Sequence, residues 1–431
     1  MITVKELKEK LSSGEYDEKL SYVYCCSADE VKPYADRIAD LAGKYTETFA
    51  ASEDSAVVIC SAPGRTELGG NHTDHQRGRV LTGAVDLDAI ACAAPNNSSM
   101  IRIFSEGYGM TSVDCSVIAP VVEENGTTAA IIRGVTAKII GMGYSVSGFN
   151  AYVRSDVPGG SGLSSSACFE VLVGAIVNEL FCSNEINSAE IAKIGQYAEN
   201  VYFGKPSGLL DQMGCSIGGI VAVDFYDKDN PKYYPVEFDF AQAGHALCII
   251  DTGASHANMT DDYSAMPNEM KSVASFFGKE VLSQVGESEF YLSIPAMRGK
   301  VGDRAIMRAV HYYTDMHHVE KQIEALENKD FDTFLHYVNE SGNSSFKYLE
   351  NVDTYRDPRY QPIILALALS QHYLSGRGAS RVHGGGLAGT IQVYVPLDML
   401  ADFSKAIDAV FGEGACRVTR IRPVGGCTLA D

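Results

Sequence analysis

The chain has 431 residues and hydrophobic side chains at 45% of its positions, so we expect about two or three domains with well-packed cores. Its formal net charge of −20 argues against nucleic acid or an anionic membrane as a partner. The 11 cysteines have no zinc-ligand spacing, and the N-terminus has no signal-peptide core. No apolar run approaches the length of a membrane-spanning helix, so we expect a cytoplasmic protein with reduced thiols.

Residues 1–45 are predicted to form an N-terminal helical extension without a chemical role. Apolar side chains recur there at helical spacing, at Ile38, Leu41, Tyr45 and Phe49. The apolar runs that follow predict three strands and one helix: strands at 57–60, 80–94 and 100–104, and a helix at 131–141.

A glycine- and serine-rich loop at residues 158–167 reads Pro-Gly-Gly-Ser-Gly-Leu-Ser-Ser-Ser-Ala. A predicted strand at 149–157 precedes it, and a predicted helix at 167–181 follows it. Glycines let a backbone approach a ligand closely, and the start of a helix attracts anions, so the loop is typical of a phosphate cradle. It lacks the lysine of a Walker A loop, and Ser165 stands where a Rossmann loop has its third glycine. The alternative is a turn that only caps a buried helix.

Residues 62–75 read Ala-Pro-Gly-Arg-Thr-Glu-Leu-Gly-Gly-Asn-His-Thr-Asp-His, which places an arginine, acids and two histidines in one turn-rich segment. In an extended conformation His72 and Asp74 would share one face. Imidazole and carboxylate groups bind sugar hydroxyls well, so hydroxyl recognition is the favoured interpretation. A zinc site formed by His72, Asp74 and His75 and a plain solvated loop are the alternatives.

A helix is predicted at residues 187–203, with Asn187 as its N-cap and Glu190 three positions later. Its predicted buried stripe consists of Ile191, Ile194, Ala198 and Val201. Glu199 lies beside this stripe, either as a surface acid or as a carboxylate directed at a metal. Asp211 follows between leucines and glycine turns, an unusual setting for a surface acid.

The second half of the chain begins with a predicted strand at 247–250. Residues 262–355 are predicted to be mostly helical. A third glycine-rich turn at 384–389 then precedes a predicted strand at 390–395.

Taken together, residues 63–74, residues 158–167, Asp211 and residues 384–389 resemble the three motifs of the GHMP small-molecule kinases and, among these, of the galactokinases. The resemblance extends from about residue 50 to the end. It implies an α+β fold of two domains, with a ribosomal protein S5 domain 2-like N-terminal domain at 46–240. It also implies a ferredoxin-like C-terminal domain at 241–431, with the active site in the cleft between them.

The family resemblance also implies roles for single residues. ATP-dependent phosphorylation of galactose at its anomeric hydroxyl would use Asp211 as base and Arg65 as the cation that stabilises the transition state. Ser166 and Glu199 would hold Mg²⁺. The ATP-binding residues would be Ser105, Gly160, Ser161, Gly162, Leu163, Ser164, Ser165 and Ser166. The sugar-binding residues would be Asn71, His72, Thr73, Asp74, Gly208 and Tyr263.

The sequence departs from the family pattern at three places. Asn71 stands where a glutamate is usual, His75 where a tyrosine is usual, and Leu387-Ala388 where Phe-Gly is usual. A kinase for another sugar, such as an arabinose-like or amino sugar, and a sugar sensor without turnover are therefore the alternatives. The expected partners are the sugar and ATP, with no nucleic acid and no membrane, and the expected state is a monomer or weak homodimer.

Overall fold

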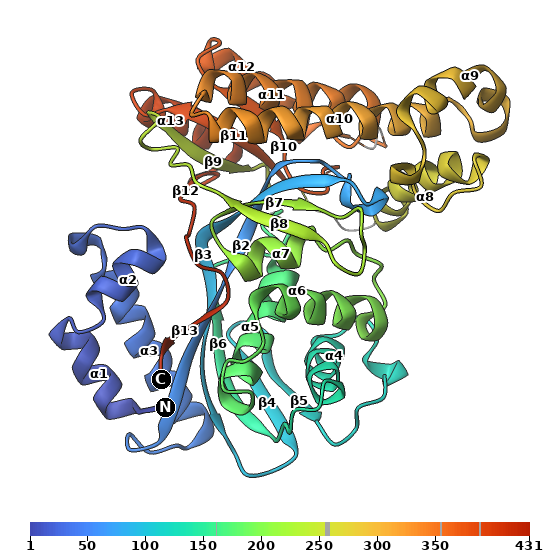
Figure 1. Ribbon diagram of the computed structural model, residues 1–431. Helices are drawn as coiled ribbons and strands as arrows, with labels where there is room; N and C mark the ends of the chain where they lie inside the picture. The colour runs from blue at the N-terminus through green and yellow to red at the C-terminus, as the bar shows by residue number, and fades with distance from the viewer. Residues whose placement is uncertain (161, 255–258, 354–355, 388) are drawn as a thin grey trace.

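Two β-sheets built from different parts of the chain organise the structure (Figure 1). The computed structural model describes residues 1–160, 162–254, 259–353, 356–387 and 389–431. Within these residues the first sheet has nine strands, in the order β1-β2-β3-β6-β4-β5, with β13 beside β2 and with β7 and β8 continuing from β3. Its strands are β1 Ile2–Thr3, β2 Ala56–Gly69, β3 Arg79–Pro95, β4 Met100–Ser105, β5 Gly109–Asp114, β6 Phe149–Ser155, β7 Ile220–Asp224, β8 Lys232–Val236 and β13 Cys427–Ala430.

Both faces of the first sheet are covered, which explains why its central strands are apolar at nearly every position. Along β2, Val58, Cys60 and Ala62 belong to one core, whereas Val57 and Ile59 belong to another. Successive strand residues point to opposite faces, so a strand buried on both sides shows a continuous apolar run.

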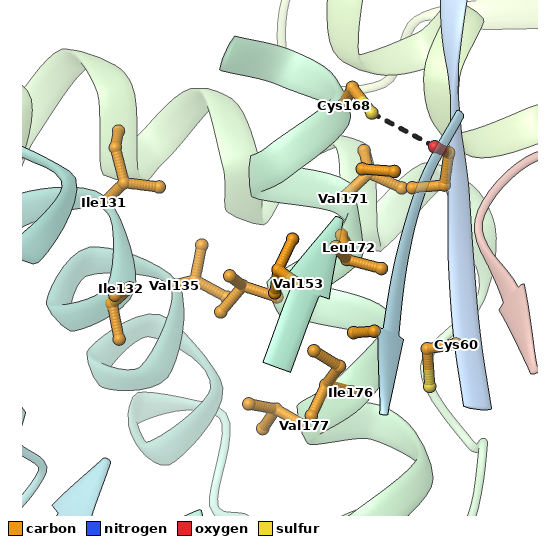
Figure 2. Packing of buried hydrophobic residues seen from close by; sticks show 14 of the residues in the cluster. Cys60, Ile131, Ile132, Val135, Val153, Cys168, Val171, Leu172, Ile176 and Val177 are labelled. Atoms are coloured by element: carbon orange, nitrogen blue, oxygen red, sulfur yellow. Dashed lines mark hydrogen bonds between the residues drawn. The ribbon is translucent and has the colours of Figure 1, made fainter. Parts of the chain in front are cut away.

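Four helices cover one face of the first sheet. Figure 2 shows part of the hydrophobic core that they form with it. These helices are α4 Thr128–Gly141, α5 Ser165–Phe181, α6 Ser188–Tyr197 and α7 Leu210–Ile217. Val171 and Leu172 of α5 pack with Val135 of α4 and Val153 of β6. Cys168 donates from Sγ to the Ala62 carbonyl at 3.0 Å, which ties the start of α5 to β2.

The N-terminal helices cover the opposite face of the same sheet, so they share its core (Figure 1). They are α1 Val4–Ser13, α2 Asp17–Tyr24 and α3 Lys32–Phe49. The helical prediction is confirmed: Ile38, Leu41 and Tyr45 are buried, and Phe49 packs against the same cluster.

The second sheet has the order β10-β11-β9-β12, and these neighbouring strands are antiparallel. Its strands are β9 His245–Asp251, β10 Ala379–Val382, β11 Thr390–Pro396 and β12 Cys416–Thr419. The helices of this half of the chain are α8 Thr260–Phe276, α9 Glu287–Val301, α10 Asp303–Glu327, α11 Phe331–Ser344, α12 Pro362–Leu374 and α13 Leu400–Phe411. The prediction that residues 262–355 are mostly helical is confirmed. Helices α12 and α13 pack on one face of this sheet, and α10 and α11 on the other.

One hydrophobic cluster joins the two sheets, because it contains Leu68 of β2, Ile220 of β7 and Leu247 of β9 together with side chains of α10 and α11. The C-terminal segment returns to the first sheet, because β13, residues 427–430, pairs with β2. The predicted boundary near residue 240 falls between β8 and β9 and stays a prediction. Among the described helices, none is both long and apolar enough to cross a membrane.

The predicted buried stripe of the helix at 187–203 is wrong at one position. Ile191, Ile194 and Ala198 are buried, but Val201 is 48% exposed. After Tyr197 the α-helix continues as a π-helical segment, Ala198–Phe203. The wider π turn changes the angle between successive side chains, so the α-helical spacing no longer keeps Val201 on the buried face.

Candidate active site

The predicted phosphate cradle lies between the end of β6 and the start of α5. Gly160 and Gly162 have φ angles of 75° and 71°, and Ser164 at the helix N-cap has a φ of 57°. The Arg65 N–H donates to the Leu163 carbonyl at 3.0 Å, which fixes the loop against β2. The N-terminus of α5 therefore faces the loop, as anion binding requires. Ser161, a predicted ATP ligand, lies outside the described residues.

The third glycine-rich turn packs directly against this cradle. A Cβ on Gly162 would lie 2.6 Å from Thr390 Oγ1 and 2.8 Å from His383 Nδ1, so only glycine fits there. His383 is buried and its Nε2 lies 3.0 Å from Thr66 Oγ1 of β2. The structure thus brings together the three motifs that the sequence presents far apart. The sequence departs from the family pattern at Leu387-Ala388, and Ala388 lies outside the described residues.

Asp211 and Arg65 form an ion pair at this junction. Arg65 Nε and Nη2 lie 2.9 and 2.6 Å from Asp211 Oδ1, while Nη1 donates to the Gly162 carbonyl. Ser164 donates to Asp211 Oδ2. The Asp211 side chain, in the first turn of α7, is 37% exposed, but that of Arg65 is only 6% exposed.

This environment keeps Asp211 ionised. Burial works to raise the pKa of the Asp211 carboxyl, but the charge of Arg65 and the Ser164 hydroxyl outweigh it, so the pKa lies below its ordinary value. The result is a partly exposed carboxylate whose position is fixed from two sides.

A second group of charges surrounds Glu199, which is buried in the π-helical segment. Gln212 Nε2 bridges two carboxylates, at 2.9 Å from Glu170 Oε2 and 3.0 Å from Glu199 Oε2. Lys205 Nζ lies 2.9 Å from Glu199 Oε1. Glu170 follows Ser166 by four residues on α5, so the two side chains share one face of the helix.

The sequence-based interpretation missed two members of this group. Glu170 is fully buried, and burial together with the Glu199 charge holds its pKa well above the ordinary value. Its spacing from Ser166 was a usable signal. For Lys205 the sequence offers no such signal, because its position one residue after Gly204 does not indicate which side chain it contacts in the fold.

The predicted sugar-binding residues meet at two places. Gly208 lies so close to Asp74 that a Cβ on Gly208 would be 1.8 Å from Asp74 Oδ2. His72 Nε2 lies 3.2 Å from the Gly385 carbonyl, and the Tyr263 hydroxyl donates to the Gly386 carbonyl at 2.6 Å. Four of the residues therefore surround the third glycine-rich turn and the loop before α7.

The segment around His72 is not extended. His72 has a φ of 60°, and Asp74–Gln76 forms a 3-10 turn, because Thr73 and Gly78 close the loop through bonds to nearby carbonyls. Burial, then the neighbouring His75, lowers the pKa of His72 to about 3, so its imidazole is neutral. A carbonyl can only accept, so Nε2 carries the proton toward Gly385.

Asn71 and Thr73 are buried and serve the loop itself. Asn71 Nδ2 donates to Glu67 Oε1 at 3.0 Å and to the Gly384 carbonyl at 2.7 Å, while Asn351 donates to Asn71 Oδ1 at 2.7 Å. The Thr73 hydroxyl lies 2.7 Å from the Arg79 carbonyl. A direct sugar contact by either side chain stays a prediction. Asn71 joins the loop to Gly384 and Asn351, whereas Thr73 joins parts of the loop itself.

We expect Asn71→Asp to lower the free energy of unfolding by about 1–3 kcal/mol, because both amide donors are lost and a carboxylate is placed beside Glu67. Urea unfolding measures this change, and the exposed Asn230→Asp serves as the control. A direct sugar contact would instead show as a raised KM for the sugar at unchanged stability.

Ser105 is the last residue of β4. It pairs with Val153 of β6, the strand that leads into the cradle. The Tyr108 N–H donates to the Ser105 carbonyl at 2.9 Å and closes the next turn. Ser105 is therefore near the predicted ATP side, and its contact with ATP stays a prediction.

The donor set fits a hard cation. Ser166 offers a hydroxyl on an exposed part of α5, and Glu199 offers a carboxylate whose side chain is 4% exposed. Within the described residues, no group of three or more His, Cys, Asp or Glu side chains is arranged to hold a metal. Mg²⁺ does not need such a group, because it keeps several waters and shares phosphate oxygens.

One cavity lies apart from this site. It has a volume of about 580 Å³ and lies between the edge of β3, β7 and β8 and the helices α9 and α10. Both of its arginines are already paired, Arg79 with Asp224 and Glu320, and Arg77 with Glu280. The charged residues of the predicted motifs converge at the cradle instead.

Comparisons with known proteins agree with this geometry. Residues 43–95 match the galactokinase galactose-binding signature, and residues 129–219 match the GHMP kinases N terminal domain. A galactokinase of Streptomyces coelicolor is 27% identical over 385 residues, which cover 88% of this chain and 94% of that protein. A galactokinase of Streptococcus thermophilus is 27% identical over 381 residues, covering 87% of this chain and 94% of that protein.

Solved structures share the fold. The crystal structure of Lactococcus lactis galactokinase complexed with galactose matches with a TM-score of 0.77 at 23% identity, covering 90% of this chain and 99% of that chain. A crystal structure of mevalonate kinase matches with a TM-score of 0.59 at 16% identity, covering 86% of this chain and all of that one. The predicted α+β architecture of two domains is confirmed, and the chain belongs to the galactokinase group of the GHMP kinases.

Proposed function

We propose that the protein is a galactokinase, which transfers the γ-phosphoryl group of ATP to the anomeric hydroxyl of galactose and forms galactose 1-phosphate and ADP. One observation carries the proposal: the Asp211–Arg65 pair lies where the cradle meets the loop of the galactose-binding signature. Arg65 contacts the cradle through the Leu163 carbonyl, and Asp74 of the signature touches Gly208, three residues before Asp211.

Phosphoryl transfer needs mainly positioning and charge stabilisation. In this proposal the backbone of residues 160–166 and the N-terminus of α5 hold the ATP phosphates, with Ser105 at their side. Asp211 accepts the proton of the sugar hydroxyl as the bond to phosphorus forms. Arg65 keeps Asp211 ionised and in place, and it adds positive charge beside the transferred group.

Ser166 and Glu199 would hold Mg²⁺, which when bound neutralises phosphate charge. On the sugar side we assign hydroxyl contacts to Asp74, the neutral His72 and Tyr263, with Gly208 leaving room for the Asp74 carboxylate. In this scheme the residues of one subunit bind both the sugar and ATP. The expected oligomeric state, a monomer or weak homodimer, stays a prediction.

A coupled assay of ADP formation tests the proposal directly. Galactose, an arabinose-like sugar and galactosamine are offered at equal concentrations with MgATP. We expect the highest kcat/KM for galactose. A higher value for another sugar would reassign the substrate, and ATP binding without turnover on any sugar would indicate a sensor.

Glu199→Gln is expected to raise the Mg²⁺ concentration for half-maximal activity by about tenfold, because one charge-assisted contact of roughly 1.5 kcal/mol is lost. Glu190→Gln is the matched control, since Glu190 lies on the preceding helix α6 and pairs with Lys193 at the surface. Equal Mg²⁺ dependence in both variants would remove Glu199 from the metal site.

A further inference from the structure

The cradle residues supply little positive charge to balance the phosphates of ATP. A triphosphate carries several negative charges, and residues 158–167 contain no lysine. Arg65 is almost fully buried, and its guanidinium already bonds to Asp211 and to the Gly162 carbonyl. Much of its charge is therefore balanced by Asp211 before any phosphate binds.

Lys205 is a second cation at the same site, and its position is fixed by the backbone. The N–H groups of Gly204 and Lys205 both donate to the Glu199 carbonyl, at 3.0 and 3.1 Å. The lysine side chain then turns back, so that Nζ lies 2.9 Å from Glu199 Oε1. Its charge also interacts with Asp211 and Glu170.

The pair between Lys205 and Glu199 is asymmetric. The Glu199 side chain is 4% exposed and its other oxygen is held by Gln212, whereas the Lys205 side chain is 58% exposed. The carboxylate is thus fixed in the protein, and the ammonium approaches it from the solvent side. A lysine ammonium is a compact charge on a flexible four-carbon stem, so it can leave one oxygen and reach another nearby.

We propose that Lys205 is a phosphate-binding cation of the active site, and that its ammonium competes with the divalent cation for Glu199 Oε1. The inference rests on the proposed function, because it needs ATP phosphates in the cradle and a metal at Glu199. When the metal takes Glu199 Oε1, the ammonium is released toward the phosphates, where it forms charge-assisted bonds. Lys205 is then a catalytic residue that contacts the transferred group.

Two measurements on the full-length protein test this, and they are expected to change in opposite directions. In Lys205→Met without nucleotide, Mn²⁺ titrated by electron paramagnetic resonance should bind roughly two- to fivefold more tightly, because the competing ammonium is gone. In the same variant, kcat with galactose should fall by about 10²-fold, as expected for the loss of one donor to the developing charge. Lys205→Arg, which keeps the charge, should recover part of kcat.

Lys193→Met is the matched control, since Lys193 pairs with Glu190 on α6 outside the site, and it should change neither value. Thermal unfolding of each variant checks that it is folded. Unchanged or weaker Mn²⁺ binding in Lys205→Met, or a kcat within twofold of the wild type, would overturn the proposal. If the wild type does not turn over galactose, the proposed function fails, and the Mn²⁺ titration still decides whether Lys205 competes for Glu199.

Discussion

Asp211→Asn is expected to lower kcat by roughly 10²–10⁴-fold, the usual contribution of general-base catalysis, while ATP still binds. Asparagine keeps the shape of the side chain and can still accept a bond from Ser164. It cannot take the proton of the sugar hydroxyl, and it leaves Arg65 without its carboxylate partner. The cradle itself is unchanged, so the affinity for ATP should be retained.

The measurement combines steady-state kinetics with ATP binding by calorimetry. Asp224→Asn is the matched control, because Asp224 also pairs with an arginine, Arg79, and its side chain is 33% exposed, but it lies outside the cradle. Breaking an ion pair can destabilise a protein, so urea unfolding is recorded for both variants. A folded Asp211→Asn protein with near-normal kcat would leave Asp211 as a positioning residue.

Local patterns in the sequence predicted a large part of this structure. The Asn187 side chain accepts from the Glu190 N–H at 3.0 Å, as its N-cap position predicted. The glycine-rich loop does lie between a strand and a helix, because glycines, the strand before them and the apolar helix after them are all signals of short range. The family resemblance assigned Asp211 and Arg65 to the same reaction, and the structure pairs them.

The remaining features depend on contacts between distant segments. The loop at His72 turns back on itself through bonds that no short pattern shows. The partners of Asn71 include Gly384 and Asn351, far along the chain, so its burial was not evident from the sequence. The same holds for the N-terminal helices, which the sequence showed as an extension and which in fact cover a face of the first sheet.

A buried ionic cluster joins these N-terminal helices to the rest of the protein. Asp88 of β3 is fully buried, and Arg37 of α3 lies 2.6 Å from its Oδ1. Tyr24 of α2 and Arg422 of the C-terminal segment lie 2.8 and 2.9 Å from its Oδ2. Burial works to raise the pKa of Asp88, but the two arginines outweigh it and the pKa is lowered. One buried carboxylate therefore contacts two guanidinium groups from opposite ends of the chain, and Arg37 also pairs with Asp156 at 3.2 Å.

Asp88→Asn is expected to lower the free energy of unfolding by about 3–5 kcal/mol, because removing one partner leaves buried charge uncompensated. The exposed Asp36→Asn, which loses only a surface pair with Lys32, should change it by less than about 0.5 kcal/mol. Urea unfolding measures both. Limited proteolysis should also cut residues 1–50 faster in Asp88→Asn, since Arg37 and Tyr24 hold these helices to β3. A loss below about 1 kcal/mol with unchanged proteolysis would show that apolar packing alone attaches the N-terminal helices.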